Sequence, residues 1–157
     1  MKLVGDGWRQ FLRNGLPLAD TLCRFLISLF AEQNWQVNLI CPVPLSQQRL
    51  RQRGYNQSAL LAQILGWAVS IPYSKKALYR IRETRSQVGL NAVQRRENVK
   101  GAFSAVPSIV QNKTVLVVDD IATTSATLSA CAEALKSAGA SQVFAITLAR
   151  TVQIEQS

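Results

Sequence analysis

The spacing of apolar residues switches several times along the chain between the patterns typical of helices and of strands, which predicts that the two alternate. Val115 to Val118 are four consecutive apolar residues, three of them β-branched, and predict a buried strand. Leu16 to Glu32 carries apolar residues at helical spacing and predicts an amphipathic helix. Ala126 to Ser137 predicts a second helix, ended by Gly139.

The other predicted elements are shorter. They are a helix over Trp8–Asn14, a strand over Val37–Cys41, a helix from Asn56 to Val69, a strand over Ala77–Ile81, a polar helix or turn over Asn91–Val99, a return to the sheet at Phe103 and a strand over Val143–Leu148. Strands that alternate with helices predict an α/β fold, with a mainly parallel sheet flanked by helices. Ligands of such sheets bind at the carboxyl ends of the strands.

The composition fits one packed domain over residues 1–157, since 48% of the residues are hydrophobic. The most apolar stretch, residues 16–31, contains Asp20 and Arg24, so no membrane insertion is predicted. The three cysteines are scattered without a metal-binding spacing, which favours buried thiols in a reducing compartment and a cytoplasmic location. Histidine is absent, which excludes Ser-His and Cys-His catalysis and histidine-ligated zinc, and no general base stands out.

A candidate sugar-phosphate site follows the strand at Val115. Asp119 and Asp120 close this strand, and paired carboxylates can bind a divalent cation or a sugar diol. The next segment is rich in hydroxyls and leads into a helix whose free N–H groups favour a phosphate; it comprises Thr123, Thr124, Ser125, Ala126 and Thr127. The plainer interpretation is that the two acids only make the end of the strand soluble, and that the residues after them form an ordinary helix cap.

This segment resembles the phosphoribosyl pyrophosphate (PRPP) signature of type I phosphoribosyltransferases. The resemblance implies that Asp119 and Asp120 contact the ribose, directly or through Mg²⁺, and that residues 123 to 127 bind the 5′-phosphate. The family usually has glycine where this chain has Ser125. Glycine lets the backbone approach an anion closely, so we expect a shifted or weakened phosphate loop that keeps its N–H and O–H donors.

Positive charge is concentrated in the middle of the chain. The formal net charge is +9, and eleven of the eighteen Lys and Arg residues fall between Arg49 and Lys100. Such clusters can hold a pyrophosphate, attach to a nucleic-acid backbone or form a solvated surface. Tyr55, Tyr73 and Tyr79 lie among them and can stack on bases, so single-stranded DNA is a second candidate partner.

Three basic blocks precede the PRPP signature. They are the sequences Val-Pro-Leu with Arg-x-Arg-x-Arg-Gly-Tyr-Asn-Gln, Arg-x-Arg-x-Thr-x-x-Gln-x-x-Leu, and Arg-x-x-Asn-x-x-Gly-Ala-Phe. Their order and spacing over residues 40 to 150 resemble the ComF family of bacterial competence-associated, GntX-like phosphoribosyltransferases. Family members commonly carry a zinc-ribbon segment before this domain, and Met1-Lys2-Leu3 resembles a segment inside the longer protein. We therefore expect a short form, a fragment or a misplaced start, and no zinc site.

The resemblance also assigns two groups of residues to the pyrophosphate end of the site. The candidate pyrophosphate loop comprises Val43, Pro44, Leu45, Ser46, Arg49 and Arg53. The candidates for a flexible hood that closes over the site are Arg80, Arg82, Thr84, Arg85 and Gln87. Closure of such a hood would exclude water and protect the activated sugar from hydrolysis.

Three functional hypotheses stay open at this point. The first is a Mg²⁺- and PRPP-dependent transferase that acts on an unidentified acceptor. The second is a non-catalytic protein that handles single-stranded nucleic acid on the same fold, and the third is a module that senses PRPP or another ribose 5-phosphate ligand. The apolar N-terminal helices are also candidates for a homodimer interface.

Overall fold

The computed structural model describes residues 17–84, 89–122 and 125–150, and the predicted alternation of helices and strands is present there. In chain order, its elements are α2 (Pro17–Glu32), β1 (Leu39–Pro42), α3 (Gln47–Arg53), α4 (Gln57–Val69), β2 (Leu78–Arg80), α5 (Ala92–Val99), β3 (Phe103–Ala105), α6 (Pro107–Val110), β4 (Thr114–Ala122), α7 (Ala126–Ser137) and β5 (Gln142–Arg150). The helix predicted over Trp8–Asn14 lies outside the described residues.

A parallel sheet of order β1-β4-β5 forms the centre of the molecule. Ile40 pairs with Leu116 on one side of β4, and Val117 pairs with Ala145 on the other. The side chains of Val115 to Val118 are fully buried because helices cover both faces of the sheet. This arrangement explains why the Val115 to Val118 part of β4 is uniformly apolar rather than alternating, and it confirms the predicted α/β fold.

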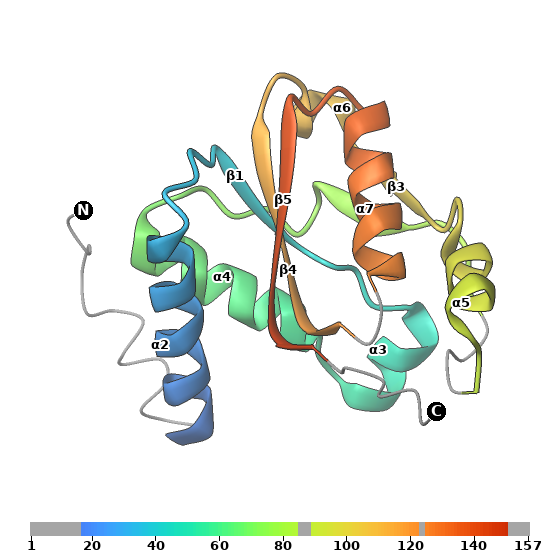
Figure 1. The fold of residues 1–157 in the computed structure, drawn as a ribbon, viewed down its shortest axis with the longest axis horizontal. Helices are drawn as coiled ribbons and strands as arrows, with labels where there is room; N and C mark the ends of the chain where they lie inside the picture. The colour runs from blue at the N-terminus through green and yellow to red at the C-terminus, as the bar shows by residue number, and fades with distance from the viewer. Residues whose placement is uncertain (1–16, 85–88, 123–124, 151–157) are drawn as a thin grey trace, which may run out of the picture.

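The sheet separates two hydrophobic clusters. Leu116 and Val118 join residues of α2 and α4, whereas Val115 and Val117 join residues of α7 and of the strands β2 and β3. Figure 1 shows α2 and α4 on one side of the sheet and α7 on the other. Neighbouring residues of β4 thus point to opposite faces and anchor different layers.

Four details differ from the sequence-based expectation. β4 continues through Ala122, so Asp119 and Asp120 lie inside the strand and not after it. Residues 47–53 form the helix α3 instead of a loop, since Ser46 caps its start, Gly54 ends it in a left-handed conformation, and the residues between them favour helix. The short helix α6 was not predicted. Phe103 begins β3, which pairs antiparallel with β2 in a separate two-stranded sheet.

The described part of the chain bears out the expectation of buried cysteines. Cys23, Cys41 and Cys131 are all buried, and burial raises the pKa of the Cys41 thiol to about 12, so this thiol behaves as a small apolar side chain. Within the described ranges, no helix has the length and apolar character needed to cross a membrane. The outer face of α2 exposes Leu22 and Phe25, where the predicted homodimer contact stays a prediction.

Candidate functional site

Asp119 and Asp120 lie near the carboxyl end of β4, the central strand of the sheet. Asp119 is only 7% exposed, whereas Asp120 is half-buried. The backbone N–H of Asp120 donates to Oδ1 of Asp119 over 3.0 Å. Burial raises the pKa of Asp119 to about 6; the hydrogen bond from Ser58 opposes this shift, and the negative charge of Asp120 adds to it. A cation bound here would favour the ionised form of the pair.

The first turn of α4 connects this acid pair to the loop after β1. The Ser58 hydroxyl donates to Asp119 Oδ1 over 2.9 Å and lies 3.5 Å from Asp120 Oδ1. The Ser58 N–H donates to the Asn56 side-chain oxygen over 3.1 Å, and Asn56 Nδ2 donates to the Val43 carbonyl over 3.0 Å. We call Asn56 and Ser58 the α4 bridge, because they join two candidate parts of the site that are far apart in sequence.

The predicted pyrophosphate loop lies at the carboxyl end of β1, beside β4. The Val43 N–H donates to the Val118 carbonyl over 2.9 Å, which fixes the start of the loop. Pro44 and Leu45 are half-buried, and the buried Ser46 hydroxyl accepts from the Arg49 N–H as the cap of α3. Arg49 and Arg53 are exposed on α3, where Arg53 Nη1 donates to Gln57 Oε1 over 3.2 Å.

The predicted 5′-phosphate segment is described only in part, because Thr123 and Thr124 lie outside the described residues. Ser125 is the N-cap of α7, yet its side chain makes no capping hydrogen bond. Its φ of −68° is in the right-handed helical region, so this position does not require glycine. Ala126 is buried and Thr127 is half-buried in the first turn. The departure from the glycine of the family therefore causes no backbone strain at Ser125.

We define the hood region as β2, the segment from Ile81 to Thr84, α5 and β3. Within it, Arg82 Nη2 donates to the Asn98 carbonyl over 3.1 Å and to the Lys100 carbonyl over 2.7 Å, at the end of α5. These bonds fasten the predicted hood to α5. The predicted hood residues Arg85 and Gln87 lie outside the described residues.

Arg80 is a half-buried cation at the end of β2. Its guanidinium lies over the Phe103 ring, with Cζ 5.4 Å from the ring centroid, and donates to Thr84 Oγ1. Burial lowers its pKa, the negative charge of Glu83 opposes that shift, and the positive charges of Arg49 and Arg82 add to it. Arg49 and Arg80 therefore repel each other across the space between α3 and the hood region, and a bound anion would relieve this repulsion.

Glu83 joins the hood region to the pyrophosphate loop. Its Oε1 accepts the backbone N–H of Gln47, the first residue of α3, over 3.1 Å. The structure thus brings together the loop and the hood segment, which are separated by 36 residues at this contact. Asp119, Asp120 and the loop are joined separately through the α4 bridge.

The acid pair could hold Mg²⁺ together with substrate phosphates, but it offers too few ligands to hold a metal ion by itself. Within the described ranges, no group of three or more histidine, cysteine, aspartate or glutamate side chains could hold a metal ion. Mg²⁺ is commonly held by one or two carboxylates together with substrate phosphates. Asp119 and Asp120 are two adjacent carboxylates that could hold Mg²⁺ in this way, and because burial raises the pKa of Asp119 to about 6, a proton would compete with the cation at acidic pH.

Comparison with known proteins identifies the family. The phosphoribosyl transferase domain family matches residues 12–153. Competence protein F of Haemophilus influenzae is 39% identical over 88% of this chain and 63% of that protein. The DNA utilization protein YhgH of Escherichia coli O157:H7 is 39% identical over 86% of this chain and 61% of that protein. A solved structure titled as the allosteric regulatory enzyme of purine biosynthesis has a TM-score of 0.54 at 24% identity, covering 81% of this chain and 25% of that one.

The fold and the extent of the match define an α/β domain of the phosphoribosyltransferase type. The chain belongs to the phosphoribosyl transferase domain family, in its ComF-like branch. It spans less than two thirds of the length of the curated relatives that it matches.

Sequence reasoning missed the α4 bridge and the contact of Glu83. The sequence predicts a helix that starts at Asn56, and the structure confirms this start with Asn56 as the N-cap, but the bond from Asn56 to Val43 was not foreseen. The sequence did not indicate that Ser58 contacts the acid pair. A serine in the first turn of a helix is common, and Asp119 lies 61 residues away. Only its place beside Asn56 in the basic block could have drawn attention to it.

Proposed function

We propose that the chain binds PRPP together with Mg²⁺ at the acid pair and transfers the ribosyl 5-phosphate to a nucleophilic acceptor. The names of its relatives, competence protein F and DNA utilization protein, support a role in the uptake or use of DNA. One observation carries the proposal: the α4 bridge holds the acid pair and the candidate pyrophosphate loop together. The match to the phosphoribosyl transferase domain family supports it.

Each part of the site has a chemical task in this proposal. Asp119 and Asp120 bind the ribose hydroxyls and the cation, while the N-terminus of α7 and its hydroxyls bind the 5′-phosphate. Mg²⁺, when bound, neutralises charge on the pyrophosphate. Arg49 and Arg80 stabilise the departing pyrophosphate, because each is a fixed cation with several donors. Catalysis then rests on positioning and charge stabilisation, which suits a chain without histidine.

Calorimetric titration of the wild-type chain with PRPP, with and without Mg²⁺, tests the binding step. We expect metal-dependent binding that the variant Asp119→Asn/Asp120→Asn loses by about a hundredfold or more, because charge-assisted contacts to ribose and metal disappear. Glu133→Gln is the control, since Glu133 is an exposed acid on α7 and its replacement removes one negative charge away from the pair.

Turnover is tested separately by the release of pyrophosphate from PRPP in the presence of pooled nucleobases and amines. Release that depends on an acceptor and on both acids supports the transferase. Binding without release would leave PRPP sensing as the function of this site. A folded wild-type chain that does not bind PRPP would contradict the proposal and favour the handling of single-stranded nucleic acid.

A further inference from the structure

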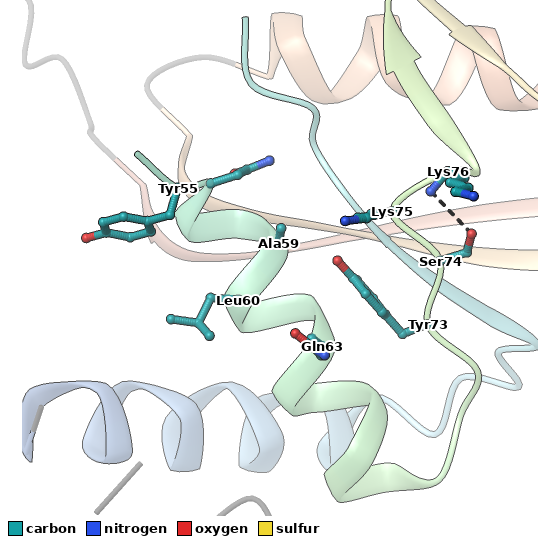
Figure 2. Close-up of a pocket in the computed structure, with 9 residues that line it drawn as sticks. Tyr55, Ala59, Leu60, Gln63, Tyr73, Ser74, Lys75 and Lys76 are labelled. Carbon is teal, nitrogen blue, oxygen red and sulfur yellow. Dashed lines mark hydrogen bonds between the residues drawn. The ribbon is translucent and has the colours of Figure 1, made fainter. Parts of the chain in front are cut away.

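A cavity of about 590 Å³ lies between the first half of α4 and the segment from Tyr73 to Lys76. Figure 2 shows α4 on one side of it and this segment on the other. The lining consists of aromatic, basic, amide and small apolar side chains: Tyr55, Asn56, Ala59, Leu60, Gln63, Tyr73, Ser74, Lys75 and Lys76. The cavity borders the α4 bridge at Asn56, but Asp119, Asp120 and the pyrophosphate loop do not line it, so it is a neighbouring site and not the one proposed for PRPP.

The segment that carries Tyr73 is held in place by hydrogen bonds and by packing. Tyr73 forms a parallel bridge with Ile40, and the Ser74 N–H donates to the Ile40 carbonyl over 2.9 Å, so this segment continues the sheet beyond β1. On the other side it packs closely on α4, where a Cβ added to Gly66 would come within 3.2 Å of the Tyr73 Cβ. The aromatic side chain therefore has a defined position before any ligand arrives.

The charges of the lining select an anionic ligand. Lys75 and Lys76 are both exposed at one end of the cavity, and none of the described residues that line it is acidic. In Figure 2 the Lys75 ammonium and the Tyr73 hydroxyl point toward the α4 side near Ala59. Two cations without a lining carboxylate favour a phosphate over a neutral ligand.

The remaining lining selects a planar ring. Ala59 provides a small apolar surface on α4, and the ring of Tyr73 opposite it offers a face for stacking; the Tyr55 ring points away from Tyr73 in Figure 2. Gln63 adds an amide that can donate to and accept from the edge of a base. We propose that this cavity binds a nucleoside phosphate, with the base between α4 and the Tyr73 ring and the phosphate on Lys75 and Lys76.

The same chemistry is present in a free nucleotide and in one unit of a single-stranded nucleic acid. Binding of a single-stranded nucleic acid has further support outside the cavity. The side chains of Arg49, Arg51 and Arg53 on α3 are exposed, and they come shortly before the lining residue Tyr55 in the chain. A continuing strand could follow these cations while one of its bases occupies the cavity. The two sources are separated by the choice of probe.

Binding of thymidine monophosphate and of a short labelled oligothymidylate is measured at low salt, by calorimetry and by fluorescence anisotropy. Lys75→Ala/Lys76→Ala tests the phosphate contact, with Arg96→Ala/Lys100→Ala as a control of equal charge change on and beside α5. Tyr73→Leu tests stacking, because leucine keeps an apolar side chain at this half-buried position and removes the ring. Tyr79→Leu is the control at a tyrosine that is 45% exposed and does not line the cavity. PRPP titration of every variant accompanies these measurements.

We expect each cavity variant to weaken binding by about tenfold, and each control by about twofold or less. Loss with both probes supports a site for a free or a strand-borne nucleotide, and loss with the oligomer alone assigns the cavity to a strand. Equal loss in cavity and control variants, or no binding of either probe by the wild-type chain, would overturn the proposal. Unchanged PRPP affinity in the cavity variants keeps this result separate from the proposed transferase.

Discussion

The acid pair and the hood region carry opposite charges and are built in opposite ways. Burial raises the pKa of Asp119, although a neutral hydroxyl and a backbone amide donate hydrogen bonds to it and oppose this shift. Arg82 is exposed and donates to two backbone carbonyls, so its charge fastens one segment to another. The difference teaches that Asp119 is held by neutral donors, whereas the hood region uses at least one of its arginines to hold its own segments together.

The largest effect is expected for the caps of two helices, one in each region. Asn56→Ala removes the cap of α4 and the bond to Val43, and we expect a loss of about 2 kcal/mol in unfolding free energy together with weaker PRPP binding. Asn91→Ala removes the corresponding cap of α5, with an expected loss of about 1 kcal/mol. Urea denaturation and PRPP titration measure both effects. Equal losses of PRPP affinity in the two variants would contradict the distinction between the regions.

The second largest effect is expected at acidic pH, which should weaken ligand binding at the acid pair. PRPP and Mg²⁺ binding should fall by about tenfold between pH 7 and pH 5, because Asp119, with a pKa raised to about 6, becomes protonated and loses its attraction for a cation. Calorimetry across this range checks the prediction, with buffers of different ionisation enthalpy to count the protons released. Affinity that stays constant down to pH 5 would exclude Asp119 as an ionised ligand.

The same pKa shift affects stability with the opposite sign. Folding raises the pKa of Asp119 from 3.8 to about 6, so the folded chain holds a proton there more tightly than the unfolded chain does. The contribution of this group to stability is therefore present at low pH and is lost as the pH rises through that window. Asp119→Asn should flatten this part of the stability profile, as measured by thermal unfolding.

Ser58→Ala tests the α4 bridge with a smaller change. Its hydroxyl lowers the pKa of Asp119, so its loss should raise this pKa further and move the acid limb of PRPP binding to higher pH. We also expect a loss of about 1 kcal/mol in stability at neutral pH, because a buried carboxylate loses a donor. Ser129→Ala, an exposed serine on α7, is the control. A purely structural role would lower stability without moving the pH profile.

Arg82→Ala is expected to have the smallest effect on the whole molecule. Because Arg82 is exposed, the loss of its two carbonyl contacts should cost about 0.5 kcal/mol in unfolding free energy. Amide hydrogen exchange should nevertheless become faster around Asn98 to Lys100, where the hood segment is fastened. Arg51→Ala on α3 is the matched control. Unchanged exchange at the end of α5 would show that Arg82 does not secure the hood region.

Much of the fold was predictable because local pattern and tertiary burial agree. The helix Pro17–Glu32 and the helix Ala126–Ser137 follow from their apolar periods, and β4 follows from its valines. Residues 47–53 were harder, since α3 buries none of its side chains and has no apolar period to reveal it. The extension of β4 past Asp120 was also missed, because the ladder to β5 continues through residues that look like a strand end.

By itself, the sequence determined the chemical inventory of this protein: two adjacent acids after a buried strand, hydroxyls before a helix, clustered arginines and no histidine. It also carried the family resemblance, through the order and spacing of four blocks. Only the tertiary structure decided which of these groups meet. Ser58 reaches Asp119, Glu83 reaches Gln47, and Tyr73 faces α4 across a cavity. The packing of α4 against β1 and β4, and the contact of the hood segment with the start of α3, bring together residues that no local pattern relates.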